Sequence, residues 1–166
     1  SYEAGEAGES IGEKTLKTVY SYDINDRLLE SIDYQIDGAE ETAVRYTEYQ
    51  YDRRGQTTGY AELSQENEPT ADEIKAHQIR YYYDSDGKLT KVTYPTTKNG
   101  VQALAYEYDQ NGWLTKIKGE VQSGDGSTEK TVRSYTYDSY GKVKEIKDYR
   151  DLLNSSDQAV KKVYTY

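Results

Sequence analysis

Residues 106–114 read YEYDQNGWL, and their Tyr-x-Tyr-Asp core recurs along the chain, usually followed by a glycine and then an aliphatic residue. Five copies of the core are complete, and a sixth, at residues 164–166, lacks its aspartate. The second tyrosines fall at positions 22, 51, 83, 108, 137 and 166, so the successive steps are 29, 32, 25, 29 and 29 residues. A period near 29 residues predicts one supersecondary unit that is repeated and stacked.

The paired tyrosines alternate with other residues, as in a β-strand that packs one face. In the first copy Thr18, Tyr20 and Tyr22 would share a face, and the tyrosines of later copies occupy the same positions. We expect a tyrosine ladder across a sheet, in which aromatic cross-strand pairs contribute roughly 0.2–1 kcal/mol each. Because a tyrosine ring packs while its hydroxyl reaches water, 20 tyrosines in 166 residues favour a thin sheet over a thick core.

The Asp-x-x-Gly step that follows each tyrosine pair predicts a tight hairpin. The aspartate opens a type I turn by accepting backbone N–H groups, and the glycine takes the left-handed conformation three residues later. The predicted turn residues are Asp52, Gly55, Asp84, Gly87, Asp109, Gly112, Asp138 and Gly141. The first copy, residues 23–27, lacks the glycine, and we expect its turn to be one residue longer.

A second arm follows each turn, with aliphatic residues three positions apart, such as Leu29 with Ile32 and Leu89 with Val92. A regular strand would place such residues on opposite faces. Two arrangements remain open, because either a bulge restores the alternation or each arm buries residues on both sides.

Similar turns at one edge and varied connections at the other predict an all-β fold. We expect an antiparallel up-and-down meander of about eleven strands, formed by β-hairpin repeats in an elongated, single-layer or curved sheet. The array would span residues 14–166 with six copies, and residues 1–13 would be a flexible leader. Within the longest connection, residues 64–76, Thr70-Ala71-Asp72-Glu73 is a capping-box pattern that predicts a short helical turn.

Composition excludes several classes of protein. A net charge of −9 opposes a nucleic-acid backbone, and no apolar run approaches the roughly 18–20 residues of a membrane span. The absence of cysteine removes disulfides, a thiol nucleophile and cysteine zinc sites. No signal peptide is present, so the chain would be intracellular or already trimmed.

Catalytic and metal chemistry have little support in the residues. His77 is the only histidine, and no nucleophile, phosphate-loop or metalloprotease motif occurs. Residues 84–87 and 123–126 offer oxygen ligands, but neither segment alone supplies the six or so that calcium needs. We therefore predict no enzyme activity, no cofactor and no bound metal.

The tyrosine ladder and the single tryptophan are the candidate ligand sites. Stacked rings on an exposed sheet face could hold a sugar or a peptide, although packing within the sheet is the commoner role. Trp113 occupies a position where neighbouring copies carry Lys88 and Lys142, so it is expected to face solvent. The residues proposed for ligand binding are Trp113, Tyr81, Tyr83, Tyr106 and Tyr108.

The segments at residues 83–89 and 108–114, with weaker copies elsewhere, resemble the YD, or RHS, repeat family over nearly all of residues 14–166. In that family the repeats form β-hairpin arrays in bacterial surface or secreted proteins and animal adhesion proteins, and in some toxins they form a hollow shell. The period is longer here, and six copies are too few to close a shell. A looser similarity links Gly112-Trp113 to the choline-binding and toxin repeats of Gram-positive surface proteins.

The resemblance implies a non-catalytic structural or adhesive module of a bacterial secreted or cell-surface protein. One alternative is a carbohydrate- or cell-wall-binding module that uses exposed Tyr and Trp rings. The other is a fragment of a toxin-encapsulating shell. The expected partners are a glycan or another surface protein, with no nucleic acid, and the open sheet edges leave the oligomeric state undecided.

Overall fold

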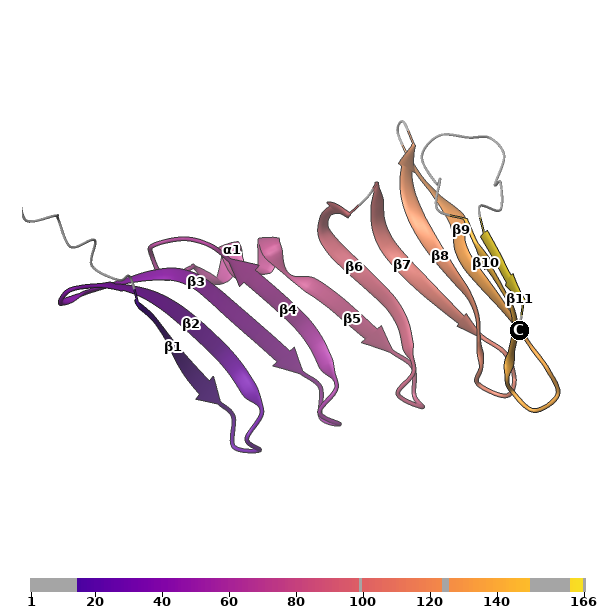
Figure 1. Cartoon of the computed structure of the whole chain (residues 1–166), viewed down its shortest axis with the longest axis horizontal. Coiled ribbons are helices and arrows are strands. Elements are labelled where there is room, and N and C mark those ends of the chain that lie inside the picture. The colour runs from indigo at the N-terminus through magenta and orange to yellow at the C-terminus, as the bar shows by residue number, and fades with distance from the viewer. Residues whose placement is uncertain (1–14, 99, 124–125, 150–161, 166) are drawn as a thin grey trace, which may run out of the picture.

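A computed structural model of the chain describes residues 15–98, 100–123, 126–149 and 162–165. These residues form one antiparallel sheet of eleven strands, in which every strand pairs with its neighbours in the sequence (Figure 1). The predicted all-β meander is therefore confirmed, and its strands form a single curved layer (Figure 1). The predicted leader at residues 1–13 lies outside the described residues.

The strands follow one another as hairpins along the sheet. Their bounds are β1 Thr15–Tyr22, β2 Leu28–Asp37, β3 Glu40–Tyr51, β4 Thr57–Leu63, β5 Ile79–Tyr83, β6 Leu89–Lys98, β7 Val101–Tyr108, β8 Leu114–Ser123, β9 Gly126–Tyr137, β10 Val143–Asp148 and β11 Lys162–Thr165. The tight turns lie along the lower edge in Figure 1, and the varied connections lie along the upper edge. We call these the turn edge and the loop edge.

The five tight turns share one hydrogen-bond pattern. In each turn the aspartate N–H donates to the carbonyl four residues later at 2.9 Å, and its carboxylate accepts the N–H groups two and four residues later. The expectation of a longer first turn is wrong. Asp26 occupies the glycine position there with φ 59°, and its N–H donates to the Asp23 carbonyl at 3.1 Å. Aspartate tolerates this left-handed conformation better than most residues.

A bulge beside each turn settles how the second arms pack. In the third hairpin Tyr83 lies opposite Leu89 and Tyr82 opposite Lys91, so Thr90 is the extra residue. Leu89 and Val92 consequently lie on the same face as the tyrosines that they oppose. The bulged residues of the five hairpins are Leu29, Thr58, Thr90, Thr115 and Lys144.

The first hairpin departs from the spacing that we inferred for its second arm. Leu28, rather than Leu29, lies opposite Tyr22, and Ser31 lies opposite Tyr20. Ile32 lies opposite Val19 and therefore on the other face. The expected pair of Leu29 and Ile32 was one residue out of register, because the first turn has the ordinary length.

The long connection after β4 contains the predicted helix. α1 spans Ala71–His77, and the Thr70 hydroxyl and Glu73 carboxylate form the capping box. α1 lies at the loop edge between β4 and β5 (Figure 1). β4 and β5 pair only through Gly59 with Arg80 and through Tyr60 with Ile79.

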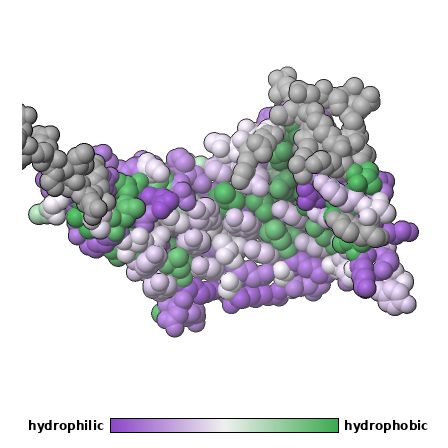
Figure 2. Space-filling view, in the orientation of Figure 1, coloured by the Kyte–Doolittle hydropathy of each residue, from purple (hydrophilic) through white to green (hydrophobic). Residues whose placement is uncertain are grey.

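Burial is shallow across the sheet, as a single layer requires. A small cluster on β7 and β8 joins Val101 and Val121, with Leu104 and Val132 packed against it. In Figure 2 hydrophobic residues gather on the visible face near these strands, and hydrophilic residues dominate the turn edge. No helix in the described part of the chain is long and apolar enough to cross a membrane.

Candidate functional site

The tyrosine pairs share one face of the sheet with the aliphatic residues of the second arms. Tyr81 lies opposite Val92, which lies opposite Leu104 on the next strand. Residues directly opposite one another point to the same side, so this tyrosine-bearing face continues from repeat to repeat. The ladder is thus interrupted by second-arm residues such as Val92 between successive tyrosine pairs.

A tyrosine hydroxyl forms a hydrogen bond across four boundaries between repeats in the described part of the chain. We call the boundary between a second arm and the next first arm a joint, as between β2 and β3. At four joints the second tyrosine of the core donates its hydroxyl to the carbonyl of the residue that begins the preceding second arm. The bonds are Tyr51 to Leu28 at 2.8 Å, Tyr83 to Thr57 at 2.8 Å, Tyr108 to Leu89 at 2.8 Å and Tyr137 to Leu114 at 2.6 Å.

Three of these hydroxyls are held in the protonated, donating form by their surroundings. Burial raises the pKa of Tyr83, Tyr108 and Tyr137 above the ordinary value of 10.0. A raised tyrosine pKa favours the neutral form, which is the form that can donate a hydrogen bond to a carbonyl. The joints at these three tyrosines therefore stay intact across the physiological pH range.

At the four joints the residue after the left-handed turn residue, which is Arg27, Gln56, Lys88 or Trp113, reaches across the same joint. Arg27 lies over the Tyr51 ring at 4.9 Å, and Lys88 Nζ lies 5.7 Å from the centre of the Tyr108 ring. At the next joint the Trp113 ring packs on a tyrosine, with 5.3 Å between the Trp113 and Tyr137 ring centres. Cations and aromatic rings can both pack on a tyrosine face, so one position accepts both kinds of residue.

The following turn glycine leaves room for this crossing side chain. A Cβ on Gly141 would lie 2.6 Å from Trp113 Cζ2, and one on Gly112 would lie 2.6 Å from Lys88 Nζ. Both glycines have positive φ, at 79° and 81°. The turn conformation favours glycine at both positions, and at Gly141 the rigid Trp113 ring also leaves no room for a side chain.

Side chains also bridge successive turns to backbone carbonyls. Gln56 Nε2 donates to the Gly87 carbonyl at 2.7 Å, and Arg54 donates to the Ser85 carbonyl at 2.6 Å. Four features thus connect neighbouring repeats at the turn edge: the tyrosine hydroxyl, the crossing side chain, the glycine beneath it and these bridges.

The structure places all five proposed ligand-binding residues on strands or beside a turn, where they are half-buried. Trp113, expected to face solvent, instead contacts Tyr137 and covers Gly141. The hydroxyls of Tyr83 and Tyr108 already hold joints. A ligand role for these residues stays a prediction. The sequence did not reveal this contact across the joint, because the residue type at the position after the turn varies from copy to copy. The position nevertheless always carries a long or aromatic side chain.

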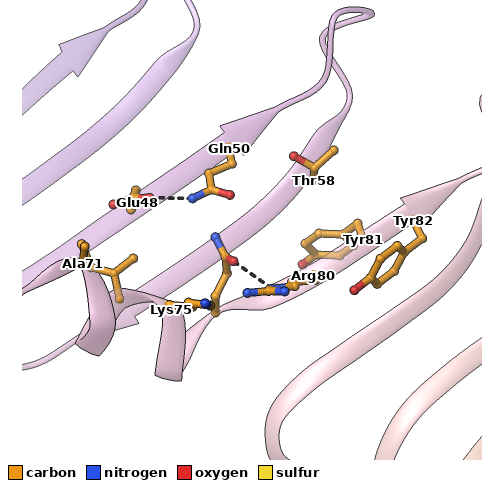
Figure 3. Close-up of a pocket in the computed structure, with 10 residues that line it drawn as sticks. Glu48, Gln50, Thr58, Ala71, Lys75, Arg80, Tyr81 and Tyr82 are labelled. Carbon is orange, nitrogen blue, oxygen red and sulfur yellow. Dashed lines mark hydrogen bonds between the residues drawn. The ribbon is translucent and has the colours of Figure 1, made fainter.

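A groove lies beside α1, where β4 and β5 pair over only a short length. Its volume is about 640 Å³, and its walls carry charges of both signs (Figure 3). Gln50 donates to Glu48 at 3.0 Å along one wall, while Lys75 and Arg80 lie along the other (Figure 3). The Tyr82 side chain is exposed at one end. This groove suits a small polar ligand better than an apolar one.

Metal sites find no geometric support in the described part of the chain. No group of three or more His, Asp or Glu side chains there could hold a metal ion. His77 is exposed on α1, and its Nδ1 lies 2.9 Å from the Glu73 carbonyl. Residues 124 and 125 of the second calcium-like segment lie outside the described residues.

Comparison with known families agrees with the repeat geometry. Residues 83–128 match the model of the RHS Repeat family. This segment is therefore similar to an RHS repeat. The matched segment begins in β5 and ends in β9, and it includes two complete turns and the joint between β6 and β7. The resemblance to YD/RHS repeats is thereby confirmed.

Other comparisons add little on function. No curated protein sequence matches the chain. A crystal structure described as TcdB2-TccC3 without hypervariable C-terminal region is 19% identical over 80% of this chain, with a TM-score of 0.46. The chain spans 8% of the length of that protein. No function is taken from a likeness of this degree.

Proposed function

We propose that the chain is a non-catalytic structural or adhesive RHS repeat module of a bacterial secreted or cell-surface protein. The observation that carries the proposal is the joint, which recurs four times with the same tyrosine-to-carbonyl bond. A repeated bond of this kind stiffens an array by linking each repeat to its neighbour. The residues that recur in each repeat form the turns and joints, so few side chains remain for a catalytic role.

Solution scattering on two variants of one turn tests the structural role. The Asp84 carboxylate accepts two backbone N–H groups of its turn, whereas Asp86 lies exposed in the same turn. Asp84→Ala should loosen the array and broaden the small-angle scattering profile, while Asp86→Ala should leave the profile unchanged. Equal profiles for both variants and the unaltered chain would count against a stiff array built on these turns.

A carbohydrate- or cell-wall-binding module is the second candidate. The polar groove beside α1, with Tyr82 exposed at its end, favours it. A titration of the chain with glycans and cell-wall fragments, read by Trp113 fluorescence and by calorimetry, tests it. Binding lost in Arg80→Ala would support the groove, and a shift lost in Trp113→Lys would support the tryptophan. No heat and no shift across the panel would remove this candidate.

A fragment of a toxin-encapsulating shell is the third candidate, supported by the RHS match at residues 83–128. Shell repeats would turn one sheet face toward a cargo. The discriminating measurement is proteolysis of the intact parent protein, because a shell protects a cargo segment that an open array leaves accessible.

A further inference from the structure

β1 is the strand whose surroundings differ most from those of its counterparts. All eight residues from Thr15 to Tyr22 are exposed, and among the described residues β1 pairs only with β2. Leu16 is 71% exposed, Tyr20 55% and Tyr22 57%. The equivalent tyrosines of β3, β5, β7 and β9 are all half-buried.

Tyr22 lacks the hydrogen bond that defines a joint. Tyr51, Tyr83, Tyr108 and Tyr137 donate their hydroxyls to a second-arm carbonyl, but no such acceptor lies beside Tyr22 among the described residues. The first turn nevertheless has the ordinary geometry, with 2.9 Å between Asp23 N and Arg27 O. The hydroxyl and the turn are thus already arranged for one more joint.

Asp26 changes the chemistry of that joint. It stands where the later turns carry the glycine that is covered by a crossing side chain. A Cβ at this position would crowd a ring placed as Trp113 is, 2.6 Å from the Cβ position of Gly141. The exposed Asp26 carboxylate would instead attract a flexible cation. Asp23, its neighbour, is already paired with Arg27 at 2.5 Å.

We propose that the outer edge of β1 at residues 16–22 binds an extended strand of another polypeptide, which leaves a tight turn and carries the pattern cation-Leu-x-x-aliphatic. Residues 88–92, KLTKV, show this pattern, and they meet β7 at an internal joint. By the register of that joint, the leucine carbonyl of the incoming strand accepts the Tyr22 hydroxyl, and its cation lies over Asp26. The strand adds to the sheet by main-chain pairing, and the side chains select it.

The occupant is a strand with a preceding turn rather than β1 of a second copy. In a two-fold pairing centred on Val19, β1 would place Leu16 opposite Tyr22, and no turn would approach Asp26. Such a dimer would leave both the hydroxyl and the carboxylate unpaired. Charge complementarity at Asp26 and continuity with the four internal joints therefore favour the basic strand.

A labelled peptide with the sequence of residues 84–94, DSDGKLTKVTY, serves as the probe in fluorescence anisotropy with the full chain. We expect saturable binding that weakens about fivefold in Tyr22→Phe, as the loss of one hydrogen bond implies. Tyr140→Phe is the matched control, since Tyr140 is exposed in a turn at the far end of the described sheet. Circular dichroism checks that each variant is folded.

A charge reversal tests the role of Asp26. A second peptide carries Glu in place of the lysine that corresponds to Lys88, and Asp26→Lys is measured with both peptides. The proposal requires the original chain to prefer the lysine peptide and Asp26→Lys to prefer the glutamate peptide. Equal binding of both peptides, or no binding to the original chain, would overturn the proposal. A dimer in sedimentation that Tyr22→Phe leaves intact and that blocks the peptide would assign the edge to a second copy.

Discussion

The turn edge of this sheet repeats one hydrogen-bond pattern, whereas the connections at the loop edge differ from one another. At the turn edge every described turn uses the same aspartate bonds, and in the first four turns the side chain after the left-handed residue crosses to the next repeat. At the loop edge one connection is the tight turn at Gly38, another contains α1, and the lengths vary widely. The repeat is therefore defined where the joints are, while the opposite edge is free to differ from hairpin to hairpin.

This difference locates the stabilising contacts between repeats. A residue changed at the turn edge affects two repeats, because turn and joint share the same few side chains. A residue changed at the loop edge affects one hairpin or one connection. The stability of such an array is the sum of free energies within repeats and between neighbouring repeats. Equivalent mutations should therefore cost more stability at the turn edge than at the loop edge.

The largest expected effect comes from glycines with the same backbone conformation at opposite edges. Gly141 and Gly38 both have positive φ, so alanine costs each roughly 1–2 kcal/mol of backbone strain. A Cβ on Gly141 would also meet the Trp113 ring at 2.6 Å, whereas nothing lies within 4 Å of one on Gly38. Gly141→Ala should lower the free energy of unfolding by about 3 kcal/mol, from strain and overpacking together.

Urea unfolding followed by circular dichroism measures both variants. In a Trp113→Ala background the extra cost of Gly141→Ala should disappear and leave the value found for Gly38→Ala. If the two glycine variants lose equal stability in the original chain, the crossing contact at this joint is not a stabilising one.

A smaller effect is expected at Gly59, where the connection from the loop edge lies against the sheet. A Cβ there would lie 2.5 Å from Gln78 Nε2, and Gln78 is only 8% exposed while it accepts a bond from Arg80. Gly59→Ala should cost about 1–2 kcal/mol, because overpacking outweighs the usual gain of alanine over glycine in a strand.

Gly126→Ala is the matched strand control, since nothing lies within 4 Å of a Cβ at that position. That variant should be neutral or slightly stabilised in the same urea experiment. A stabilised Gly59→Ala would mean that Gln78 moves aside at no cost, and the account of this connection would be wrong.

The parts of this fold that are local in the chain could be predicted from the residues. Asp109 and Gly112 stand three positions apart, and their turn follows from backbone chemistry alone. The capping box of α1 is equally local. The spacing of Leu89 and Val92 is compatible with a bulge, but it does not establish one. Two buried faces would also explain aliphatic residues three positions apart.

The joints could not be predicted, because each joins residues 19 to 26 positions apart, and only the folded sheet sets which strand positions lie opposite one another. Trp113 shows the difficulty, since its lysine counterparts made it look exposed, yet its partner Tyr137 belongs to the next repeat. Asp26 was missed for another reason, because a non-glycine residue rarely takes its conformation. The proposed ligand residues remain predictions, and the groove beside α1 arose from a connection with no counterpart in the other repeats.

A pH dependence at Asp23 gives a smaller test of the turn edge. Hydrogen bonds from the Arg27 side chain and backbone lower the pKa of Asp23 from 3.8 to about 2. A carboxyl group with a lowered folded-state pKa contributes stability above pH 3.8 that is lost as the pH falls toward 2. Asp23→Asn should therefore flatten the fall in stability over this range, as measured by urea unfolding at several pH values. An unchanged slope would contradict the ion pair with Arg27.

The most direct test of the joint is the removal of one hydroxyl from an internal tyrosine and one from its counterpart on β1. Tyr108→Phe removes the 2.8 Å bond to the Leu89 carbonyl, and Tyr22→Phe removes a hydroxyl with no such acceptor among the described residues. The free energy of unfolding should fall by about 1 kcal/mol for Tyr108→Phe and stay the same for Tyr22→Phe. Equal values for the two variants would contradict the claim that the tyrosine hydroxyl holds one repeat to the next.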